Sequence, residues 1–474
     1  MYCTLSLMGT IEPFMKQKPP RAQQVANTVI ERIEQGQLTA GTRLPSIRNA
    51  TLSFGVSKNT IIDAYDRLVA TGYISPRRGS GFYVEATRPA HPAIKPEHFT
   101  EAVDLVSLLR EQLNQHYEVR AGDGRLPASW MESSDIRRYF KRSNQDNDAR
   151  DEFEYGNPQG LIGLREDIAR TLNDRAISVH PNQILMTFGA NHALDLIVRH
   201  FVEPGEVVLV ESPGYYPMFG KLRLQRAKTI GITRGPQGLD LDMLEQSIRE
   251  YRPRLLFVQP MAHNPTGTSM SLQNMHALLR IAEQHDLTII EDDPFGDILP
   301  RSTPHLASLD GLNRVIYVGT FSKTLSASMR CGYIAANQTL VRSLIDIKML
   351  TVVTSSSIIE RMIHEMIIHG RYRRQMTRLR ERVAKASAAA ISSLKNIGFK
   401  QIQPPTGSYY IWCPLPKSVD GLELAKKASA QGIFLAPGNL FTLGNDESGS
   451  ALRINIALAN HPLLLNFLKE EALS

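Results

Sequence analysis

A lysine flanked by hydroxyl side chains is the residue of this chain best suited to chemistry. Lys323 lies in the stretch VGTFSKTLSASMRCGY, between Ser322 and Thr324 and seven residues before Arg330. A lysine amine can form a Schiff base with a carbonyl compound. Most loop lysines have no such role. The groups that accompany Lys323 therefore decide what it does.

Other polar and aromatic groups follow short apolar runs, where strands would end. The runs and their groups are QILMTF before Gly189, Ala190 and Asn191, EVVLVES before Tyr215, RLLFVQP before Asn264 of HNPTG, and LTIIED ending at Asp292. Each group alone has an ordinary explanation, since NPTG is a common turn and an acidic cluster is usually solvated. Together, backbone amides, an aromatic ring, an amide, a carboxylate and an amine match pyridoxal phosphate. The carboxylate would keep the pyridine nitrogen protonated, and the lysine would form the Schiff base.

The apolar runs alternate with helical patterns, which predicts an α/β fold with a mostly parallel sheet covered by helices on both faces. RVIYVGT before the lysine and CGYIAA after it complete the expected strands. Open sheets of this kind bind ligands beyond the carboxyl ends of their strands. The fold would thus bring the separate groups to one edge of the sheet.

The first 85 residues predict a different kind of domain. Apolar residues recur at helical spacing between Arg21 and Gln35, and Gly36 ends the pattern. Ser46 and Ser57 are suited to cap a short and a longer helix, which the turn FGV joins. This order is that of a helix-turn-helix, in which the start of the second helix enters the major groove of DNA.

The expected DNA contacts lie at the start of that second helix and in a basic turn after it. Backbone N–H groups at a helix start favour phosphate, and Asn and Lys side chains can read base edges. YISPRRGSGFYV follows as two short strands around a glycine-rich tip, the pattern of a wing. The candidate contacts are Arg43, Arg48, Ser57, Lys58, Asn59, Thr60, Arg77, Arg78 and Gly79.

Basic charge is concentrated in this head. Residues 1–90 hold 11 lysines and arginines against 6 acidic residues, and the rest of the chain holds 43 against 41. A basic head on a nearly neutral body suggests a polyanion partner for the head, although an ordinary solvated surface would give the same pattern. Prolines at positions 89, 92 and 96 indicate an extended linker between head and body.

Length and composition bound the class of protein. A chain of 474 residues predicts two or three domains. No stretch is apolar enough to span a bilayer, and the first fourteen residues lack the pattern of a secretory signal. Cys3, Cys331 and Cys413 are too scattered for a disulfide framework or a CxxC metal site. We therefore expect a cytoplasmic, globular protein without a membrane segment or a metal site.

The head resembles the winged helix-turn-helix of the GntR regulators. The resemblance rests on GTRLPSIRNAT, GVSKNTIIDAYDRLVATGYI and RRGSGFYV, in that order. Matched by position, it implies DNA contacts by Arg48, Ser57, Lys58, Asn59, Thr60, Arg78 and Gly79.

The body resembles a fold-type I aminotransferase domain, and head and body together resemble the MocR subgroup of GntR regulators, which includes the GabR-like proteins. The implied domains are a winged helix-turn-helix at 17–85, a linker at 86–115 and an aminotransferase-like domain at 116–474. The resemblance implies that Lys323 forms the Schiff base and that Asp292 partners the pyridine nitrogen. Asn264 would contact the ring hydroxyl and Tyr215 would stack on the ring.

The same resemblance assigns the remaining site residues. Tyr155 in YGNPQGLIGL matches a tyrosine that reaches the phosphate of the neighbouring subunit, which implies a homodimer with shared sites. Arg453 in ALRINIAL matches an arginine that binds a substrate carboxylate, a role suited to its planar fork. The residues expected around the phosphate are Gly189, Ala190, Asn191, Thr320, Ser322 and Arg330.

Two positions depart from the family pattern. Phe295 in EDDPFGD stands where the family has a tyrosine whose hydroxyl bonds the ring oxygen. Ala327 stands where the family has a proline after the lysine loop, which is a smaller change. Neither change removes cofactor binding, but the missing hydroxyl weakens the case for efficient transamination.

Three functions fit these features. The first is a DNA-binding transcriptional regulator that binds pyridoxal phosphate and senses it, or an amino compound, through exchange of the lysine imine. The second is an active pyridoxal-phosphate-dependent aminotransferase that carries an accessory DNA-binding head. The third is a regulator whose pocket has lost the cofactor and binds another small anion. We favour the first, because the lost hydroxyl at position 295 harms catalysis more than binding.

Overall fold

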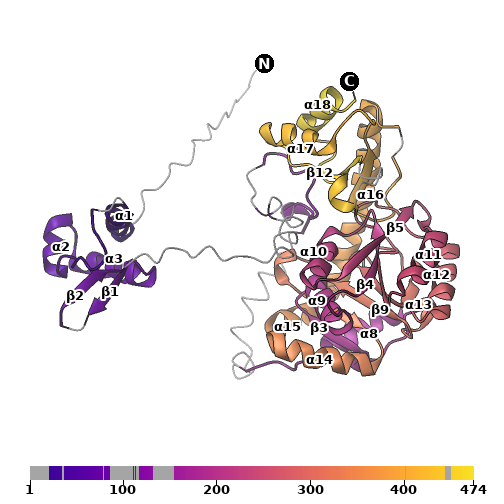
Figure 1. The fold of residues 1–474 in the computed structure, drawn as a ribbon, viewed down its shortest axis with the longest axis horizontal. Helices are drawn as coiled ribbons and strands as arrows, with labels where there is room; N and C mark the ends of the chain where they lie inside the picture. The colour runs from indigo at the N-terminus through magenta and orange to yellow at the C-terminus, as the bar shows by residue number, and fades with distance from the viewer. Residues whose placement is uncertain are drawn as a thin grey trace, which may run out of the picture. The chain divides into compact units, whose positions relative to one another are not determined.

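The computed structural model describes residues 21–34, 37–77, 79–85, 110, 113, 117–131, 154–400, 402–443 and 450–473. These residues form two compact units, a head and a larger body, divided between Ile94 and Lys95 (Figure 1). Most of the predicted linker, as well as Arg78 of the predicted wing, lies outside the described residues. Across the described ranges, no helix is long and apolar enough to cross a membrane.

The head contains three helices followed by a two-stranded hairpin. Its elements are α1 (Arg21–Glu34), α2 (Ile47–Phe54), α3 (Lys58–Ala70), β1 (Ile74–Arg77) and β2 (Gly81–Val84). Both predicted caps are confirmed, since the Ser46 hydroxyl accepts from the N–H of Asn49 and the Ser57 hydroxyl accepts from that of Thr60. Gly55 takes the left-handed conformation, with φ of 62°, that ends α2 and makes the tight turn. Local sequence signals therefore account for the helix-turn-helix.

An eight-stranded sheet forms the centre of the body and contains all six predicted strands. In spatial order its strands are β3 (Ile184–Thr187), β10 (Gly332–Ala335), β9 (Val315–Thr320), β8 (Thr288–Asp293), β7 (Leu255–Val258), β4 (Val207–Ser212), β5 (Lys228–Gly235) and β6 (Gly238–Leu239). β9, β8, β7, β4 and β5 run parallel, as the prediction of a mostly parallel sheet requires. β10 and β6 are antiparallel to their neighbours. The sequence analysis did not predict β5, β6 or the direction of β10.

Helices cover both faces of this sheet (Figure 1). Successive residues of β9 pack on opposite faces of the sheet. Ile316 and Val318 pack in the core formed with α9 (Ala190–Phe201), α10 (Tyr216–Leu224) and α14 (Gln338–Val352). Val315 and Tyr317 pack in the core formed with α8 (Ile162–Asn173), α11 (Leu241–Tyr251), α12 (Leu272–Gln284) and α13 (Leu306–Asp310). Burial of both faces explains why the strands appear in the sequence as continuous apolar runs. Helix α15 (Ser357–Ile368) also packs in the second of these cores.

The C-terminal part of the body, orange to yellow in Figure 1, contains a second, smaller sheet. Its three antiparallel strands lie in the order β11 (Tyr410–Pro414), β13 (Ala451–Asn455) and β12 (Ala436–Pro437). The accompanying helices are α16 (Arg371–Ile397), α17 (Gly421–Ala430) and α18 (Pro462–Glu471), and a short helix α6 (Ala128–Met131) precedes the main sheet in the chain. β11 and β13 carry the side chains that this part contributes to the site.

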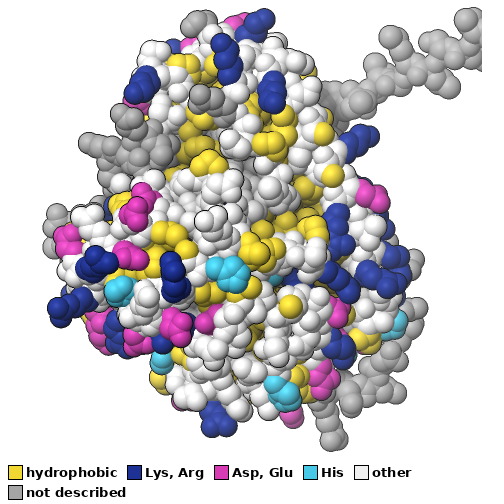
Figure 2. Space-filling model, turned by 90° about the vertical axis from the view of Figure 1, so that its right-hand side faces the viewer, with side chains coloured by type: hydrophobic (Ala, Val, Ile, Leu, Met, Phe, Trp, Pro, Cys, Tyr) yellow, Lys and Arg dark blue, Asp and Glu magenta, His cyan; other side chains and the backbone are white. Residues whose placement is uncertain are grey.

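The surface of the body carries both signs of charge on the face shown in Figure 2. Lysine and arginine side chains are mixed with aspartate and glutamate at the left of this view and predominate at its right, and hydrophobic side chains lie across the middle. This mixture agrees with the near balance of charges outside the head.

Gly319 of β9 provides a test of the close packing between β9 and β10. It lies opposite Tyr333 of β10, and a Cβ at position 319 would lie 2.3 Å from Tyr333 Cζ. Gly319→Ala should therefore lower the free energy of unfolding by about 1–3 kcal/mol, the range for overpacked cores. Gly235→Ala in β5 is the matched control, because the nearest atom to its Cβ would be 3.9 Å away. Equal urea midpoints for the two variants would contradict the packing.

Candidate functional site

The predicted site residues follow neighbouring strands of the main sheet. Lys323 follows β9, Asp292 lies at the end of β8, Asn264 follows β7 and Tyr215 follows β4, and these four strands are adjacent and parallel. β10 pairs with both β9 and β3, and so brings Gly189, just after β3, to the same edge. The topology thus collects groups that are more than a hundred residues apart in the chain.

Asp292 is a buried carboxyl group, and only one of its two oxygens has a hydrogen-bond partner among the described residues. Its Oδ2 accepts a hydrogen bond of 2.5 Å from Gln259 Nε2, but Oδ1 has no hydrogen-bond partner among the described residues. Burial raises the pKa of Asp292 to about 7; neighbouring Asp293 adds to the rise, while the bond from Gln259 and the charge of Lys323 oppose it. An N–H donor carrying positive charge, such as a pyridinium nitrogen, would satisfy Oδ1 and ionise this carboxyl group.

Gln259 is a site residue that the sequence analysis missed. Besides donating to Asp292, its Oε1 accepts from the N–H of Asn264 at 3.0 Å, and its own N–H donates to Glu211 Oε2 at 2.7 Å. It therefore positions two predicted residues at once. The only sequence signal was a polar residue at the end of the apolar run RLLFV, which also suits a strand end without a function.

Arg453 and Asn264, both predicted, are in direct contact. Arg453 is 1% exposed, and its Nη1 donates to Asn264 Oδ1 at 2.9 Å while Nη2 donates to the Gly122 carbonyl at 2.7 Å. The rings of Tyr410 and Phe441 flank its guanidinium, with centroids 4.7 and 4.8 Å from Cζ. Its Nε has no partner in the part of the chain that the structure describes. A buried guanidinium with a spare donor can bind a carboxylate.

The predicted phosphate ligands surround Gly189, which precedes α9 with φ of 76°. A Cβ at this position would lie 3.0 Å from Arg330 Nη2 and 3.5 Å from Ser322 Oγ, so these two side chains converge on the glycine. Thr320 Oγ1 donates to Ser322 Oγ at 3.1 Å. Ala190 and Asn191 open α9, where the first N–H groups lack partners within the helix. The cradle contains hydroxyl, guanidinium and amide donors, which are the groups that a phosphate requires.

Lys323 is partly buried, and two groups contact its amine. Nζ donates to the carbonyl of Gly124 and lies 3.4 Å from the hydroxyl oxygen of Tyr410. The sequence analysis missed both partners. Tyr215 is likewise partly buried, and its ring stacks beside Phe257 at an interplanar angle of 27°. Burial and the neighbouring Asp292 carboxylate raise the pKa of Tyr215.

The predicted site residue Tyr155 lies on the surface of the body. It is 84% exposed, and the segment that follows it packs on the junction of α14 and α15. A Cβ on Gly156 would lie 3.3 Å from Ser357 Cβ, and Lys348 Nζ donates to the Pro158 carbonyl at 2.7 Å.

The predicted DNA contacts of the head lie on its surface. Lys58 and Asn59 are exposed at the start of α3, whereas the opposite face of α3 is buried. Arg43 and Arg48 are exposed as well, and Arg43 Nε approaches the hairpin at Gly81. Arg77 lies over the Tyr83 ring at 4.4 Å, and exposed Gly79 takes a φ of 73° in the turn. Ser57 serves as a helix cap and bonds the Thr60 hydroxyl, so its oxygen is engaged locally.

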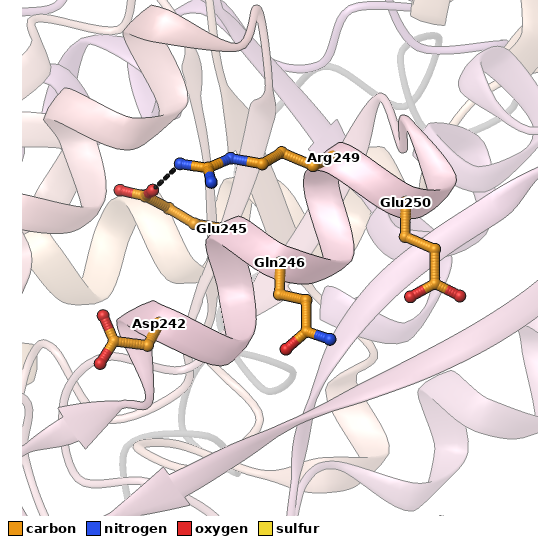
Figure 3. Close-up of a pocket in the computed structure, with 5 residues that line it drawn as sticks. All are labelled: Asp242, Glu245, Gln246, Arg249 and Glu250. Atoms are coloured by element: carbon orange, nitrogen blue, oxygen red, sulfur yellow. Dashed lines mark hydrogen bonds and ion pairs between the residues drawn. The ribbon is translucent and has the colours of Figure 1, made fainter.

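A depression of about 550 Å³ on the outer side of α11 is unrelated to these residues (Figure 3). Its lining is charged, with an ion pair of 2.7 Å between Glu245 and Arg249, and contains none of the predicted site residues. Its lining residues are Asp242, Glu245, Gln246, Arg249 and Glu250. They form a solvated helix surface.

Comparison with protein families decides the class of the body. Residues 127–469 match the model for aminotransferase class I and II. The chain belongs to the aminotransferase class I and II family. Residues 21–84 match the model for bacterial regulatory proteins of the gntR family. A GntR helix-turn-helix joined to an aminotransferase domain is the MocR-like architecture, as predicted.

Curated relatives share this architecture over nearly their whole length. The chain is 27% identical over 463 residues to the uncharacterized HTH-type transcriptional regulator YisV of Bacillus subtilis, covering 95% of this chain and 94% of that one. It is 28% identical over 440 residues to YdcR of Escherichia coli, another uncharacterized HTH-type transcriptional regulator, covering 90% and 93%.

Solved aminotransferases share the fold of the body. LysN, the α-aminoadipate aminotransferase of Thermus thermophilus, solved with N-(5'-phosphopyridoxyl)-L-leucine, matches with a TM-score of 0.71 and 24% identity over 78% of this chain and 96% of that one. Kynurenine aminotransferase of Pyrococcus horikoshii, solved with PMP, matches with a TM-score of 0.69 and 23% identity over 78% and 93%.

Within this aminotransferase-family body, the two departures from the pattern occupy different environments. Phe295 is fully buried, with its ring edge-on to Tyr409 at 4.8 Å and to Tyr410 at 5.8 Å. Ala327 begins a short 3-10 turn that ends at Met329, so the loop after the lysine forms without proline. The missing tyrosine hydroxyl at position 295 therefore affects the site, whereas the missing proline at position 327 affects only the loop after Lys323.

The raised pKa of Asp292 predicts an unusual dependence of stability on pH. Between about pH 4 and pH 7 the unfolded carboxyl releases a proton that the folded one keeps, so this group destabilises the ligand-free fold as pH rises. The Asp292→Asn variant has no titrating carboxyl group at this position, so it does not show this loss of stability as pH rises. Between pH 5 and pH 8, the free energy of unfolding of the wild type should fall by about 2 kcal/mol more than that of the variant. This figure allows for relaxation of the buried site, which reduces the effect of the raised pKa. Urea titration of ligand-free protein measures the difference.

The control for this comparison is Asp242→Asn, which removes an exposed carboxylate from α11. It should leave the pH dependence of wild type unchanged. If Asp292→Asn behaves like this control, the carboxyl group at 292 is already ionised in the ligand-free protein.

Proposed function

We propose that this protein is a DNA-binding transcriptional regulator whose aminotransferase-like domain binds pyridoxal phosphate and senses the cofactor or an amino compound that reacts with it. The observation that carries the proposal is that Asp292 lies at the end of β8 and Lys323 follows the adjacent, parallel β9, in a chain with a GntR head. The Asp292 carboxyl group is buried, and its Oδ1 has no hydrogen-bond partner among the described residues. The regulator names of the curated relatives support the same function.

The DNA-binding half of the proposal rests on the exposed start of α3. Lys58 and Asn59 present an amine and an amide there, beside the first N–H groups of the helix. Arg77 extends the basic surface onto the hairpin. Double-stranded operator DNA is the partner that this arrangement fits.

The sensing half rests on how the site would hold its ligand. Pyridoxal phosphate supplies, when bound, an aldehyde that condenses with an amine and releases water. Lys323 offers the amine, Asp292 would pair with the ring nitrogen, and the cradle around Gly189 would hold the phosphate. Arg453 would bind the carboxylate of an amino compound that competes with Lys323 for the aldehyde. A competing amine changes DNA binding only if it has different affinities for two states of the protein.

A homodimer is the assembly that the surface favours. Large apolar side chains are exposed around the segment after Tyr155 and at the junction of α14 and α15, two regions that pack together. They are Tyr155, Ile162, Met349, Leu350, Val352, Val353 and Ile358. Contiguous apolar surface of this kind marks an interface, and Tyr155 within it would reach the site of the second subunit. We place the assembled regulator in the cytoplasm, where it meets DNA.

A working aminotransferase is the second candidate, because Lys323, Asp292 and Arg453 are all present in the sequence. Phe295 argues against it, since the ring at this position has no hydroxyl. Sustained turnover of an amino acid with a keto acid would favour the enzyme. Conversion of bound cofactor without turnover would favour the sensor.

DNase footprinting on DNA upstream of the protein's own gene, with and without pyridoxal phosphate, tests the regulator. We expect protection that changes in extent or position when the cofactor is present. Absence of protection in both conditions would remove the DNA-binding claim.

Lys323→Ala tests the cofactor claim. Wild-type protein mixed with pyridoxal phosphate should develop a visible absorbance band that requires the lysine, and the variant should not. Lys221→Ala, which removes a lysine of α10 that pairs with Asp195, should keep the band. A spectrum identical for wild type and Lys323→Ala would favour a pocket that binds a different small anion.

Arg77→Ala tests the wing. Each phosphate contact adds about 0.9 to the slope of the logarithm of affinity against the logarithm of salt concentration. Loss of Arg77 should therefore reduce that slope by about 0.9, measured by fluorescence anisotropy at several salt concentrations. Arg32→Ala removes the same charge from the exposed surface of α1 and should leave the slope unchanged. Equal slopes for Arg77→Ala and wild type would show that the hairpin does not contact DNA.

A further inference from the structure

A tyrosine from the small sheet reaches the amine of Lys323. Tyr410 begins β11, and its hydroxyl oxygen lies 3.4 Å from Lys323 Nζ. The same hydroxyl donates to the carbonyl of Gly124 at 2.8 Å. Since its proton is directed to Gly124, the lone pairs of the phenol oxygen remain available to the lysine amine. Lys323 Nζ is thus held between two acceptors, one from the main chain and one from a side chain.

The Tyr410 ring is fixed on several sides. It is fully buried, the edge of the Phe295 ring packs on it, and the Arg453 guanidinium lies over it at 4.7 Å. β11 pairs with β13, which carries Arg453. The phenol therefore has one position relative to both the reactive amine and the arginine expected to bind a carboxylate.

Neighbouring Tyr409 has a different role. Its hydroxyl donates to the main-chain carbonyl of Lys323 at 2.6 Å and does not contact the amine. The two tyrosines are adjacent in the chain and both fully buried, and they differ in which end of Lys323 they contact. Tyr409 is accordingly a matched control for Tyr410.

We propose that Tyr410 is a positioning residue, whose hydroxyl orients the Lys323 nitrogen for bonding to the carbonyl carbon of its ligand. Phe295 stands where a family tyrosine would supply a hydroxyl, and Tyr410 brings a phenol to the same site from a strand more than a hundred residues later. Tyr410 acts on the lysine nitrogen, so it restores a hydroxyl to the site without reproducing a bond to the ring oxygen. This inference rests on the proposed function, because it assumes that Lys323 bonds an aldehyde.

Two ligands separate this role from a merely structural one. Pyridoxal phosphate has the aldehyde that reacts with lysine, whereas pyridoxine phosphate has the same ring and phosphate but no aldehyde. Tyr410→Phe should raise the Kd of pyridoxal phosphate about fivefold, as expected for the loss of one hydrogen bond. It should leave the Kd of pyridoxine phosphate within about twofold of wild type. Fluorescence titration measures both constants, and the visible band reports the bond to the lysine.

Tyr409→Phe, the control, should change the two constants by equal factors. Equal factors for Tyr410→Phe as well would overturn the proposal and leave Tyr410 as a packing residue. If Tyr410→Phe does not fold, Tyr410→His is measured instead, because its shorter ring places no polar atom where the phenol oxygen lies. A wild type without a lysine-dependent band would refute the proposed function itself, an outcome distinct from failure of this inference.

Discussion

The buried carboxylate of Asp292 is the constraint on which the site depends. A carboxylate enclosed by protein is costly unless donors satisfy both oxygens, and among the residues that the structure describes only Oδ2 has one. The fold therefore presents an acceptor that gains a partner only when a donor enters the site. Binding of a cationic N–H donor would relieve that cost and ionise the carboxyl group.

A network of buried hydrogen bonds and ion pairs positions the Asp292 side chain. Gln259 bonds Asp292 and Asn264, and its backbone is bonded in turn by Glu211. Glu211 pairs with Arg234 and with His263, both buried. Buried networks whose members are bonded to one another fix side-chain positions more strongly than single contacts do. A ligand entering the site would therefore meet prearranged groups.

The same chain joins this site to a separate DNA-binding unit. A GntR head of known motif and an aminotransferase-family body make a regulator the natural interpretation. In the proposed sensor, an amine that competes with Lys323 would alter the contents of the site without any need for turnover. The presence of Phe295 favours sensing over catalysis, because this residue lacks the hydroxyl of the family tyrosine and keeps a packed ring.

Much of the fold and the site could be predicted because the signals are local. The caps Ser46 and Ser57 act within one helical turn, and the six predicted strands are continuous apolar runs buried on both faces. β5 escaped prediction because KTIGITRG mixes polar and apolar residues, and no local rule states the direction of β10.

The sequence by itself determined the kinds of domain, the strands, and the reactive groups that follow them. Only the tertiary structure decided which atoms meet: Gln259 with Asp292, Asn264 with Arg453, and the amine of Lys323 with Gly124 and Tyr410. These partners come from segments up to about two hundred residues apart. A hydrogen bond requires its atoms to lie within about 3 Å, and only the path of the whole folded chain sets that separation.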